Sequence, residues 1–279
     1  MKAPSITTIT SYWDRPEMLE VWMEAMRHCT IDDVEHLLFF VGEQPSAFPA
    51  LPKGLRVVQY PLTEKFSIGH CHNMGARLAN TEWIMKIDVD TLPSLAFFRE
   101  LRDLLESASP REWFNCGMVY FKPVFSQSLL ALGSQPICET RHKMICANLR
   151  LYSSRGYCKP AATNFICRTQ DYIDLGGCHK EFHGYGWEDY QQIYMLERYQ
   201  QAKDPLPGGV TPANVTQRCR EEISRRKALE LFERNRIFCL FHRWHANAPK
   251  HHKMMDRNRR ILLEYIRERR ATSQLPSSP

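Results

Sequence analysis

Several features that mark particular classes of protein are missing from this 279-residue chain. No apolar run approaches the roughly 20 residues of a membrane-spanning helix, so we expect no membrane span. The first residues, Met1 to Ser5, lack the apolar core of a signal peptide, and we therefore expect a cytoplasmic protein. No internal repeat is visible. What remains is an ordinary globular composition, with 43% hydrophobic and 24% charged residues.

The ten cysteines include no C-x-x-C pair. This absence disfavours a zinc ribbon, which needs paired spacing. The cysteines are spread evenly and mostly in apolar surroundings, a pattern typical of buried free thiols in a reducing compartment. Cys239 stands close to two histidines, which would suit zinc, but it lies within an apolar strand. We predict that it belongs to the core.

Charge is nearly balanced except near the C-terminus. Eight basic and three acidic side chains lie between Lys250 and Arg270, so this segment carries +5 of the net charge of +6. Apolar residues are interleaved with the charges. The segment is therefore either a helix that docks by its apolar face or a strip that binds a polyanion, such as nucleic acid or an acidic polysaccharide.

The first third alternates strands and helices. We predict strands at 5–10, 34–41, 55–60 and 83–87, with helices at 17–29 and 69–79. This alternation predicts a parallel-rich sheet with helices on both faces. Ligands of such sheets bind beyond the carboxyl ends of the strands, where Tyr12 to Arg15, Glu43 and Asp88 to Asp90 fall.

The remainder is less regular. We predict helices at 94–107 and 221–234, and strands at 114–121, 144–151, 162–167 and 237–241. Residues 203–214 have the composition of a loop.

The stretch from Phe182 to Asp189 is an aromatic and glycine-rich turn that leads into two adjacent carboxylates, Glu188 and Asp189. Its two glycines allow the backbone to bend and to approach a ligand closely. Apolar residues recur at roughly helical spacing afterwards, so the carboxylates would stand in a first helical turn, where the helix dipole favours them. An acidic helix start and a pair of catalytic carboxylates are both consistent with this pattern.

Two other motifs carry metal-ligand side chains. Asp88 and Asp90 stand two apart at a strand end, and such hard carboxylates suit Mg²⁺ or Mn²⁺ held jointly with phosphates. His242 and His245 follow the last predicted strand, and imidazole suits Mn²⁺ or Zn²⁺. Each pair alone also fits a structural role. The segment from Asn73 to Arg77 opens a predicted helix near the same edge, where it would meet a phosphate or sugar or form an ordinary first turn.

In this order, the motifs resemble those of the GT-A glycosyltransferases of the family 2 type. The C-terminal half is similar to the galactosyltransferase module of β-1,4-galactosyltransferases and chondroitin-type polymerases. The matched segments, within about residues 5–245, are 9–16, 66–75, 87–90, 163–166 with 175–177, 184–189 and 242–245. The Glu-Asp block is the most specific of them and D-x-D the least.

The resemblance implies an α/β fold of the GT-A (Rossmann-like) type. It has a mixed, mostly parallel sheet flanked by helices, in a single compact domain with two halves. Residues 1–92 would bind the nucleotide sugar and residues 93–249 would carry the acceptor and catalytic side chains. Residues 250–270 would form the basic helical segment, and residues 271–279 a disordered tail.

The resemblance also implies roles by position. Asp90, His242 and His245 would hold Mn²⁺ or Mg²⁺, with His242 in a position that is Met in the galactosyltransferases. Asp189 would be the general base, and Glu188 would hold the acceptor or donor sugar. The implied donor-binding residues are Thr10, Tyr12, Arg15, Glu43, Asn73, Arg77, Asp88 and Trp187. The implied acceptor-binding residues are Asn164, Tyr185 and Gly186. Tyr185 and Trp187 depart from the family's Trp and Gly at these positions.

These roles predict a metal-dependent inverting hexosyltransferase that uses a nucleotide sugar, most commonly a UDP-sugar in this family. The acceptor is a glycan by default, and a hydroxylated base in DNA is an alternative. A segment from Ala246 to about Met255 would be a lid over the donor. Two other classes stay open: a nucleotidyltransferase, which leaves the Glu-Asp block without a role, and a non-catalytic polyanion-binding protein, which leaves the carboxylates unexplained.

Overall fold

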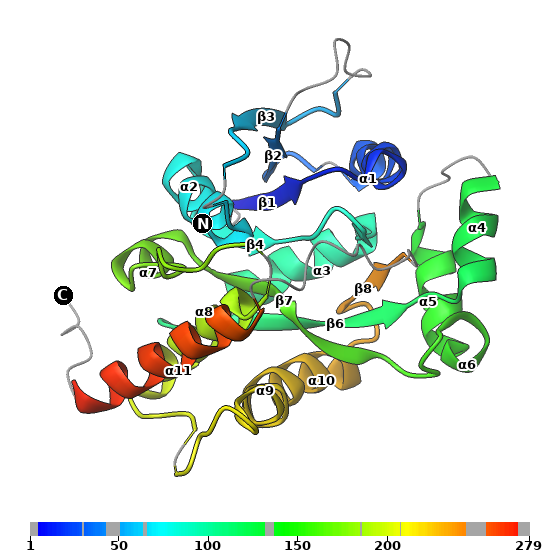
Figure 1. The fold of residues 1–279 in the computed structure, drawn as a ribbon. Coiled ribbons are helices and arrows are strands. Elements are labelled where there is room, and N and C mark those ends of the chain that lie inside the picture. The colour runs from blue at the N-terminus through cyan, green and yellow to red at the C-terminus, as the bar shows by residue number, and fades with distance from the viewer. Residues whose placement is uncertain are drawn as a thin grey trace.

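The computed structural model describes residues 5–29, 31–42, 51–63, 66–131, 137–184, 186–206, 208–243 and 255–272. One eight-stranded sheet runs through them in the order β3-β2-β1-β4-β7-β6-β8-β5 (Figure 1). Predicted sites at Glu43, Tyr185 and His245, the predicted lid up to residue 254, and the tail from 273 fall outside the described residues. The described helices include none that is long and apolar enough to cross a membrane.

The first half is a parallel sheet, as predicted. Its strands are β1 (Ile6–Tyr12), β2 (Val34–Val41), β3 (Leu55–Tyr60) and β4 (Trp83–Lys86), and every pairing among them is parallel. Helices α1 (Pro16–Cys29) and α2 (Ile68–Leu78) make the crossovers. The run Val34–Val41 is apolar almost throughout because this strand is covered on both faces.

The second half is mixed. β7 (Lys159–Arg168) is antiparallel to both β4 and β6 (Phe114–Tyr120), whereas β8 (Cys239–His242) is parallel to β6 and antiparallel to β5 (Thr91–Leu92). The helices of this half are α3 (Leu95–Glu106), α4 (Pro123–Ala131), α5 (Glu139–Ala147), α6 (Leu149–Tyr152), α7 (Thr169–Asp174), α8 (Glu188–Gln201), α9 (Val215–Arg218), α10 (Arg225–Arg234) and α11 (Met255–Ala271). A π-helical turn, η1 (Cys219–Ser224), joins α9 to α10. The mixed α/β sheet confirms the predicted Rossmann-like GT-A arrangement.

The strand predicted at 144–151 is wrong, because this segment forms the end of α5 and most of α6. His142, Ile145 and Cys146 are buried while Met144 and Leu151 are exposed, a pattern with the period of a helix. A short apolar run cannot be assigned to strand or helix by hydrophobicity alone. The helix puts His142 and Cys146, four residues apart, on one face of α5.

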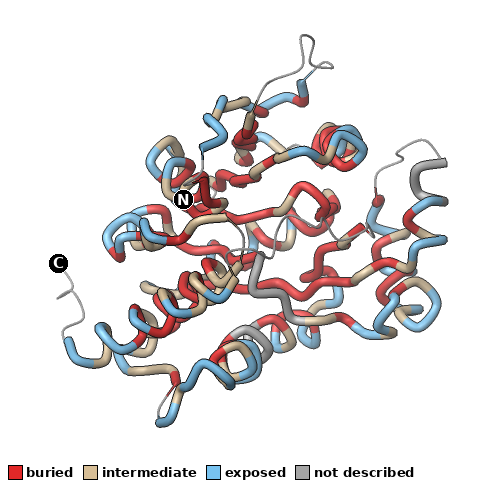
Figure 2. The backbone as a smooth tube through the Cα atoms, in the orientation of Figure 1, coloured by how far each residue is buried: buried red, intermediate tan, exposed pale blue. Residues whose placement is uncertain are grey.

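The basic C-terminal segment is a docked helix. α11 lies beside α8 in Figure 1, and its side chains Leu262, Leu263, Tyr265 and Ile266 are buried. Figure 2 shows the strands as a buried layer, with exposed residues at the periphery of the helices. Packing of the apolar residues therefore accounts for the interleaved pattern of this segment.

Candidate active site

The pairing of β5 with β8 brings the D-x-D and H-x-x-H motifs together. His242 is the register partner of Thr91, and the amide of Arg243 donates to the carbonyl of Asp90 over 2.9 Å. As a result, Nε2 of His242 lies 3.7 Å from Oδ2 of Asp90. The guanidinium of Arg15 also lies at this carboxylate, 2.8 Å from Oδ2. Residues about 150 positions apart in the chain thus meet at one edge of the sheet.

The donor set at this edge fits a divalent cation. A carboxylate and an imidazole are both ligands that Mn²⁺ accepts. Two ligands at about 2.1 Å from one ion stand up to about 4.2 Å apart, which accommodates the pair of Asp90 and His242. The ring of Tyr120 packs on that of His242 with a centroid separation of 4.6 Å and so restricts the imidazole.

Lys86 links the D-x-D motif to the Glu-Asp block. Its Nζ contacts Oδ1 of Asp189 and lies 3.7 Å from Oδ1 of Asp88, and its side chain is almost completely buried. Burial alone would lower the pKa of Lys86, but the carboxylates of Asp189 and Asp88 hold it above its ordinary value. A buried ammonium therefore orients both carboxylates. The only sequence signal for Lys86 was a single charge within the apolar strand β4.

The two adjacent carboxylates occupy different environments. Glu188 is buried, and its Oε2 has no hydrogen-bond partner among the described residues. Burial and the neighbouring charge of Asp189 raise the pKa of Glu188 to about 8. Asp189 instead lies against the ammonium of Lys86. Glu188 is therefore mostly neutral near pH 7, and the two carboxylates have different partners.

The turn before α8 is held in an unusual backbone conformation. Gly184 and Gly186 have φ values of 67° and 98°, and Trp187 adopts a left-handed conformation with φ of 77°. A side chain at Trp187 makes this conformation costly, and such strain persists only where the surroundings enforce it. Trp187 is the N-cap of α8, so the strained residue directly precedes Glu188.

Asn258 of α11 holds this turn from the other side. Its Nδ2 donates to the carbonyls of His183 (2.8 Å) and Gly186 (3.1 Å), and its Oδ1 accepts from the amide of His183 (3.3 Å). Asn258 is completely buried. The C-terminal helix thus supports the turn before α8, a role that the charge pattern of the segment did not reveal.

Three other residues predicted to bind the donor or the acceptor, Thr10, Asn164 and Tyr12, differ in their surroundings. The Oγ1 of Thr10 and both amide atoms of Asn164 are buried without a partner among the described residues. Tyr12 packs on Phe40 at the end of β1.

The predicted sites on α2 are placed differently from our expectation. This helix begins at Ile68, with Ser67 as its N-cap, so Asn73 does not open it and Arg77 lies exposed in its last turn. The Asn73 amide exchanges two 2.8 Å hydrogen bonds with the backbone of Cys178. The structure therefore gives Asn73 a tethering contact, and donor binding by either residue stays a prediction.

Two cations that sequence analysis missed contact tyrosines near the predicted site: Tyr120 packs on His242, and Tyr190 follows Asp189 in the chain. Nζ of Lys159 stands 5.4 Å from the ring centroid of Tyr120, and Arg220 donates to the hydroxyl of Tyr190 over 3.0 Å. Both line a pocket of about 440 Å³ between the start of β7 and the segment η1–α10. The π-helical turn that carries Arg220 is a form often found at functional sites.

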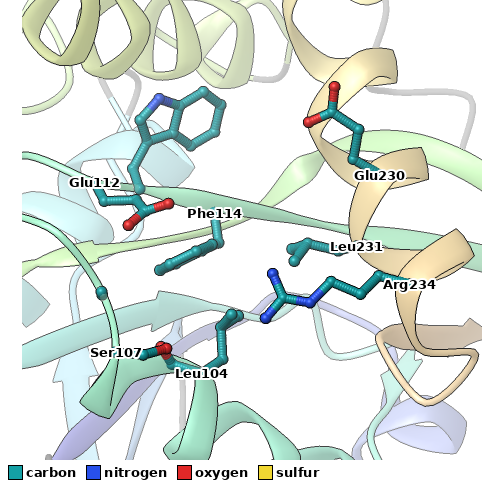
Figure 3. Close-up of a pocket in the computed structure, with 9 residues that line it drawn as sticks. Leu104, Ser107, Glu112, Phe114, Glu230, Leu231 and Arg234 are labelled. Carbon is teal, nitrogen blue, oxygen red and sulfur yellow. The ribbon is translucent and has the colours of Figure 1, made fainter.

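A smaller pocket, of about 210 Å³, lies between the end of α3 and α10. Figure 3 shows Arg234 extending across it from α10 toward Leu104 and Ser107. None of the predicted site residues lines this pocket.

A comparison with protein families agrees with the motifs. The family model described as glycosyltransferase like family 2 matches residues 53–266. A comparison with curated proteins finds no match. Among solved structures, glucosyl-3-phosphoglycerate synthase from Mycobacterium tuberculosis, crystallised with Mn²⁺, UDP and glucosyl-3-phosphoglycerate, is similar at 11% identity with a TM-score of 0.46, over 95% of this chain and 80% of that chain.

Residues 1–349 of TarS from S. aureus are similar at 11% identity with a TM-score of 0.45, over 83% of this chain and 73% of that chain. The family model covers well over half of the present sequence. The chain therefore belongs to the glycosyltransferase-like family 2 and is a glycosyltransferase.

Proposed function

We propose that the protein is a metal-dependent inverting glycosyltransferase that moves a hexosyl group to an acceptor hydroxyl. The observation that carries this proposal is the meeting of three separate motifs. Lys86 joins Asp88 to Asp189, and Asp90 adjoins His242. A nucleotidyltransferase would use the D-x-D motif but would not need the further carboxylate of Asp189 that Lys86 holds beside it.

Asp90 and His242, with His245 as a predicted third ligand, would hold Mn²⁺ or Mg²⁺ in this proposal. A divalent cation there would neutralise charge that develops on the departing pyrophosphate. Asp88 and Thr10, at the ends of β4 and β1, would face the donor. Arg15 now pairs with Asp90, so donor and cation binding would require this guanidinium to find an anionic partner on the nucleotide.

Asp189 is the proposed general base. An acceptor hydroxyl is a weak nucleophile until its proton is taken, and a carboxylate held at a fixed position does this as the new bond forms. Lys86 keeps the carboxylate oriented. Glu188, mostly neutral near pH 7, would donate a hydrogen bond to the sugar or the acceptor. A base on the face opposite the leaving nucleotide gives in-line displacement with inversion.

The proposed class of acceptor rests on the pocket near the candidate site and not on the basic helix α11. On α11, Arg257 lies 3.7 Å from Glu181 and Arg270 pairs with Asp204, so part of its charge is neutralised within the protein. These contacts leave a DNA acceptor without structural support. Lys159 and Arg220, by contrast, line the pocket beside Tyr120 and Tyr190. We propose a glycan or small sugar-like acceptor that carries an anionic group.

A donor panel tests the reaction. Nucleotide release should be measured with UDP-, GDP-, dTDP- and CMP-sugars in Mn²⁺, as nucleoside diphosphate from the first three and as CMP from the last. Mass spectrometry of candidate acceptors should follow. We expect one donor class to release its nucleotide and the acceptor to gain the mass of a hexosyl group. Transfer of a nucleotidyl mass instead would contradict the proposal.

Removal of the cation tests the metal. Excess EDTA should abolish turnover and added Mn²⁺ should restore it, because the single positive charge of Arg15 at Asp90 would not replace a divalent cation at the departing pyrophosphate. Asp90→Ala should abolish turnover even in saturating Mn²⁺. Full activity in EDTA would refute the metal assignment.

A further inference from the structure

A second group of metal-ligand side chains lies buried behind the active-site edge. His142 and Cys146 come from α5 and Cys239 from β8, and all three are almost completely buried. Their ligand atoms all lie within 4.8 Å of one another. Cys146 and Cys239 belong to a core cluster with Val119 and Phe121, and the ring of His142 packs on Phe241 of the same cluster, so water has little access to them.

The distances match those of ligands around one tetrahedral ion. The sulfurs of Cys146 and Cys239 are 3.4 Å apart, and the sulfur of Cys239 is 3.5 Å from Nε2 of His142. A disulfide would hold its sulfurs at about 2.05 Å. Two thiolates at about 2.3 Å from a tetrahedral zinc ion lie about 3.8 Å apart, and a thiolate and an imidazole nitrogen about 3.5 Å apart. The observed spacing is therefore close to that of a zinc site.

The histidine is held as zinc-bound histidines are. Its Nδ1 lies 2.8 Å from Oγ of Ser94, which also caps α3 by accepting from the amide of Phe97. The ring packs edge-to-face on Phe241 at 4.6 Å. In the tautomer that donates from Nδ1 to Ser94, the lone pair of Nε2 faces Cys239. Second contacts of this kind fix the ring orientation of metal ligands.

Cys158 supplies a fourth sulfur. It is buried just before β7, and its thiol interacts with that of Cys239. A Cβ at residue 117 would lie 2.4 Å from this sulfur, so Gly117 leaves the space that it occupies. Cys158 is not within the group whose ligand atoms all lie within 4.8 Å of one another, so it would have to move toward His142 and Cys146.

We propose that His142, Cys146, Cys158 and Cys239 bind a structural zinc ion. A closed set of one imidazole and three thiolates is typical of structural zinc, and it has no open position for catalysis. The ion would link α5 to β8 through Cys239, which lies three residues before His242. It would therefore fix the position of the strand that carries the imidazole of the candidate active site. This site is separate from the cation site at Asp90 and does not depend on the proposed reaction.

Metal content is the first test. The untagged protein, purified under reducing conditions from zinc-supplemented cells without chelator, should contain about one zinc per chain. A mercurial reagent that blocks thiols should release it. A zinc content near zero, together with no binding of added Zn²⁺ by the reduced protein, would overturn the proposal.

Cobalt substitution separates this site from Asp90 and His242. The Co²⁺-loaded wild-type protein should show thiolate-to-cobalt charge-transfer absorption, which carboxylate and imidazole ligands cannot produce. Cys146→Ala and Cys239→Ala should lose this absorption, whereas Cys167→Ala, a buried thiol of β7 outside the cluster, should retain it. If Cys158→Ala retains the absorption, Cys158 is not a ligand. If Cys146→Ala and Cys239→Ala retain it, the proposed zinc site is wrong. Wild-type spectra decide the matter if a variant fails to fold.

Discussion

At the scale of single residues, the candidate site contains two adjacent carboxylates, Glu188 and Asp189, that have different surroundings. Glu188 is buried beside Asp189, and its pKa rises to about 8 from an ordinary value of 4.5. Asp189 instead contacts the ammonium of Lys86. The sequence predicted the carboxylate pair because glycines and aromatics precede a helical pattern. It could not assign the partner of each carboxylate, because Lys86 lies 103 positions away from Asp189.

The raised pKa of Glu188 predicts a pH-dependent loss of stability. Between about pH 5 and 8 the unfolded chain has an ionised Glu188 and the folded chain does not, so folding binds a proton and stability falls as pH rises. The slope is at most about 1.4 kcal/mol per pH unit. Glu188→Gln imitates the neutral form and does not titrate, so its stability relative to the wild type should rise across this window.

Denaturant unfolding at pH 5 and pH 8 measures this effect. Exposed Glu106→Gln is the control and should shift stability by the same amount at both pH values. If the difference between Glu188→Gln and the wild type is also the same at both values, Glu188 is ionised in the folded protein.

At the scale of elements, the parallel half of the sheet could be predicted from the sequence. The meeting of the D-x-D and H-x-x-H motifs could not. Strands 34–41 and 55–60 were predicted with their observed bounds, because apolar β-branched runs between turns are local signals. The meeting of Asp90 with His242 depends on the pairing of β5 with β8, and β5 has only two residues. The helix α5 was taken for a strand because Met144 to Leu151 is a short apolar run, which hid the alignment of His142 with Cys146.

α11 should act on catalysis through Asn258. Asn258→Ala removes three hydrogen bonds to His183 and Gly186 and leaves their backbone groups without these partners. Displacement of the turn by about 1 Å should lower kcat by roughly 10²-fold, while donor affinity changes little. Steady-state kinetics would measure kcat, and a separate donor-binding experiment would measure donor affinity.

Two further variants sharpen that test. Arg260→Ala, at an exposed position of the same helix, should leave kcat unchanged. Asn258→Asp keeps the acceptor for the amide of His183 and loses both donated hydrogen bonds, so its kcat should fall between those of the wild type and Asn258→Ala. Equal effects of Arg260→Ala and Asn258→Ala would mean that α11 serves general stability only.

At the scale of the whole molecule, Lys159 and Arg220 line a pocket near the candidate site. On the basic helix α11, by contrast, Arg257 and Arg270 form ion pairs with carboxylates of the protein itself. Arg220→Ala should raise KM for an anionic acceptor by about 10–10²-fold, the worth of a hydrogen bond to a charged group. Hydrolysis of the donor in the absence of acceptor should not change. Arg218→Ala, two residues earlier and paired with Glu222, is the matched control. An unchanged KM for the acceptor in Arg220→Ala would place the acceptor elsewhere.

The central claim is that Asp189 takes the proton of the acceptor hydroxyl at a site assembled from both halves of the sheet. The most direct measurement compares kcat and donor affinity in Asp189→Asn, which keeps the shape of the side chain and removes the proton acceptor. We predict a fall in kcat of about 10²–10⁴-fold, with donor binding nearly unchanged. A variant with near wild-type kcat would contradict the assignment of Asp189 as the base.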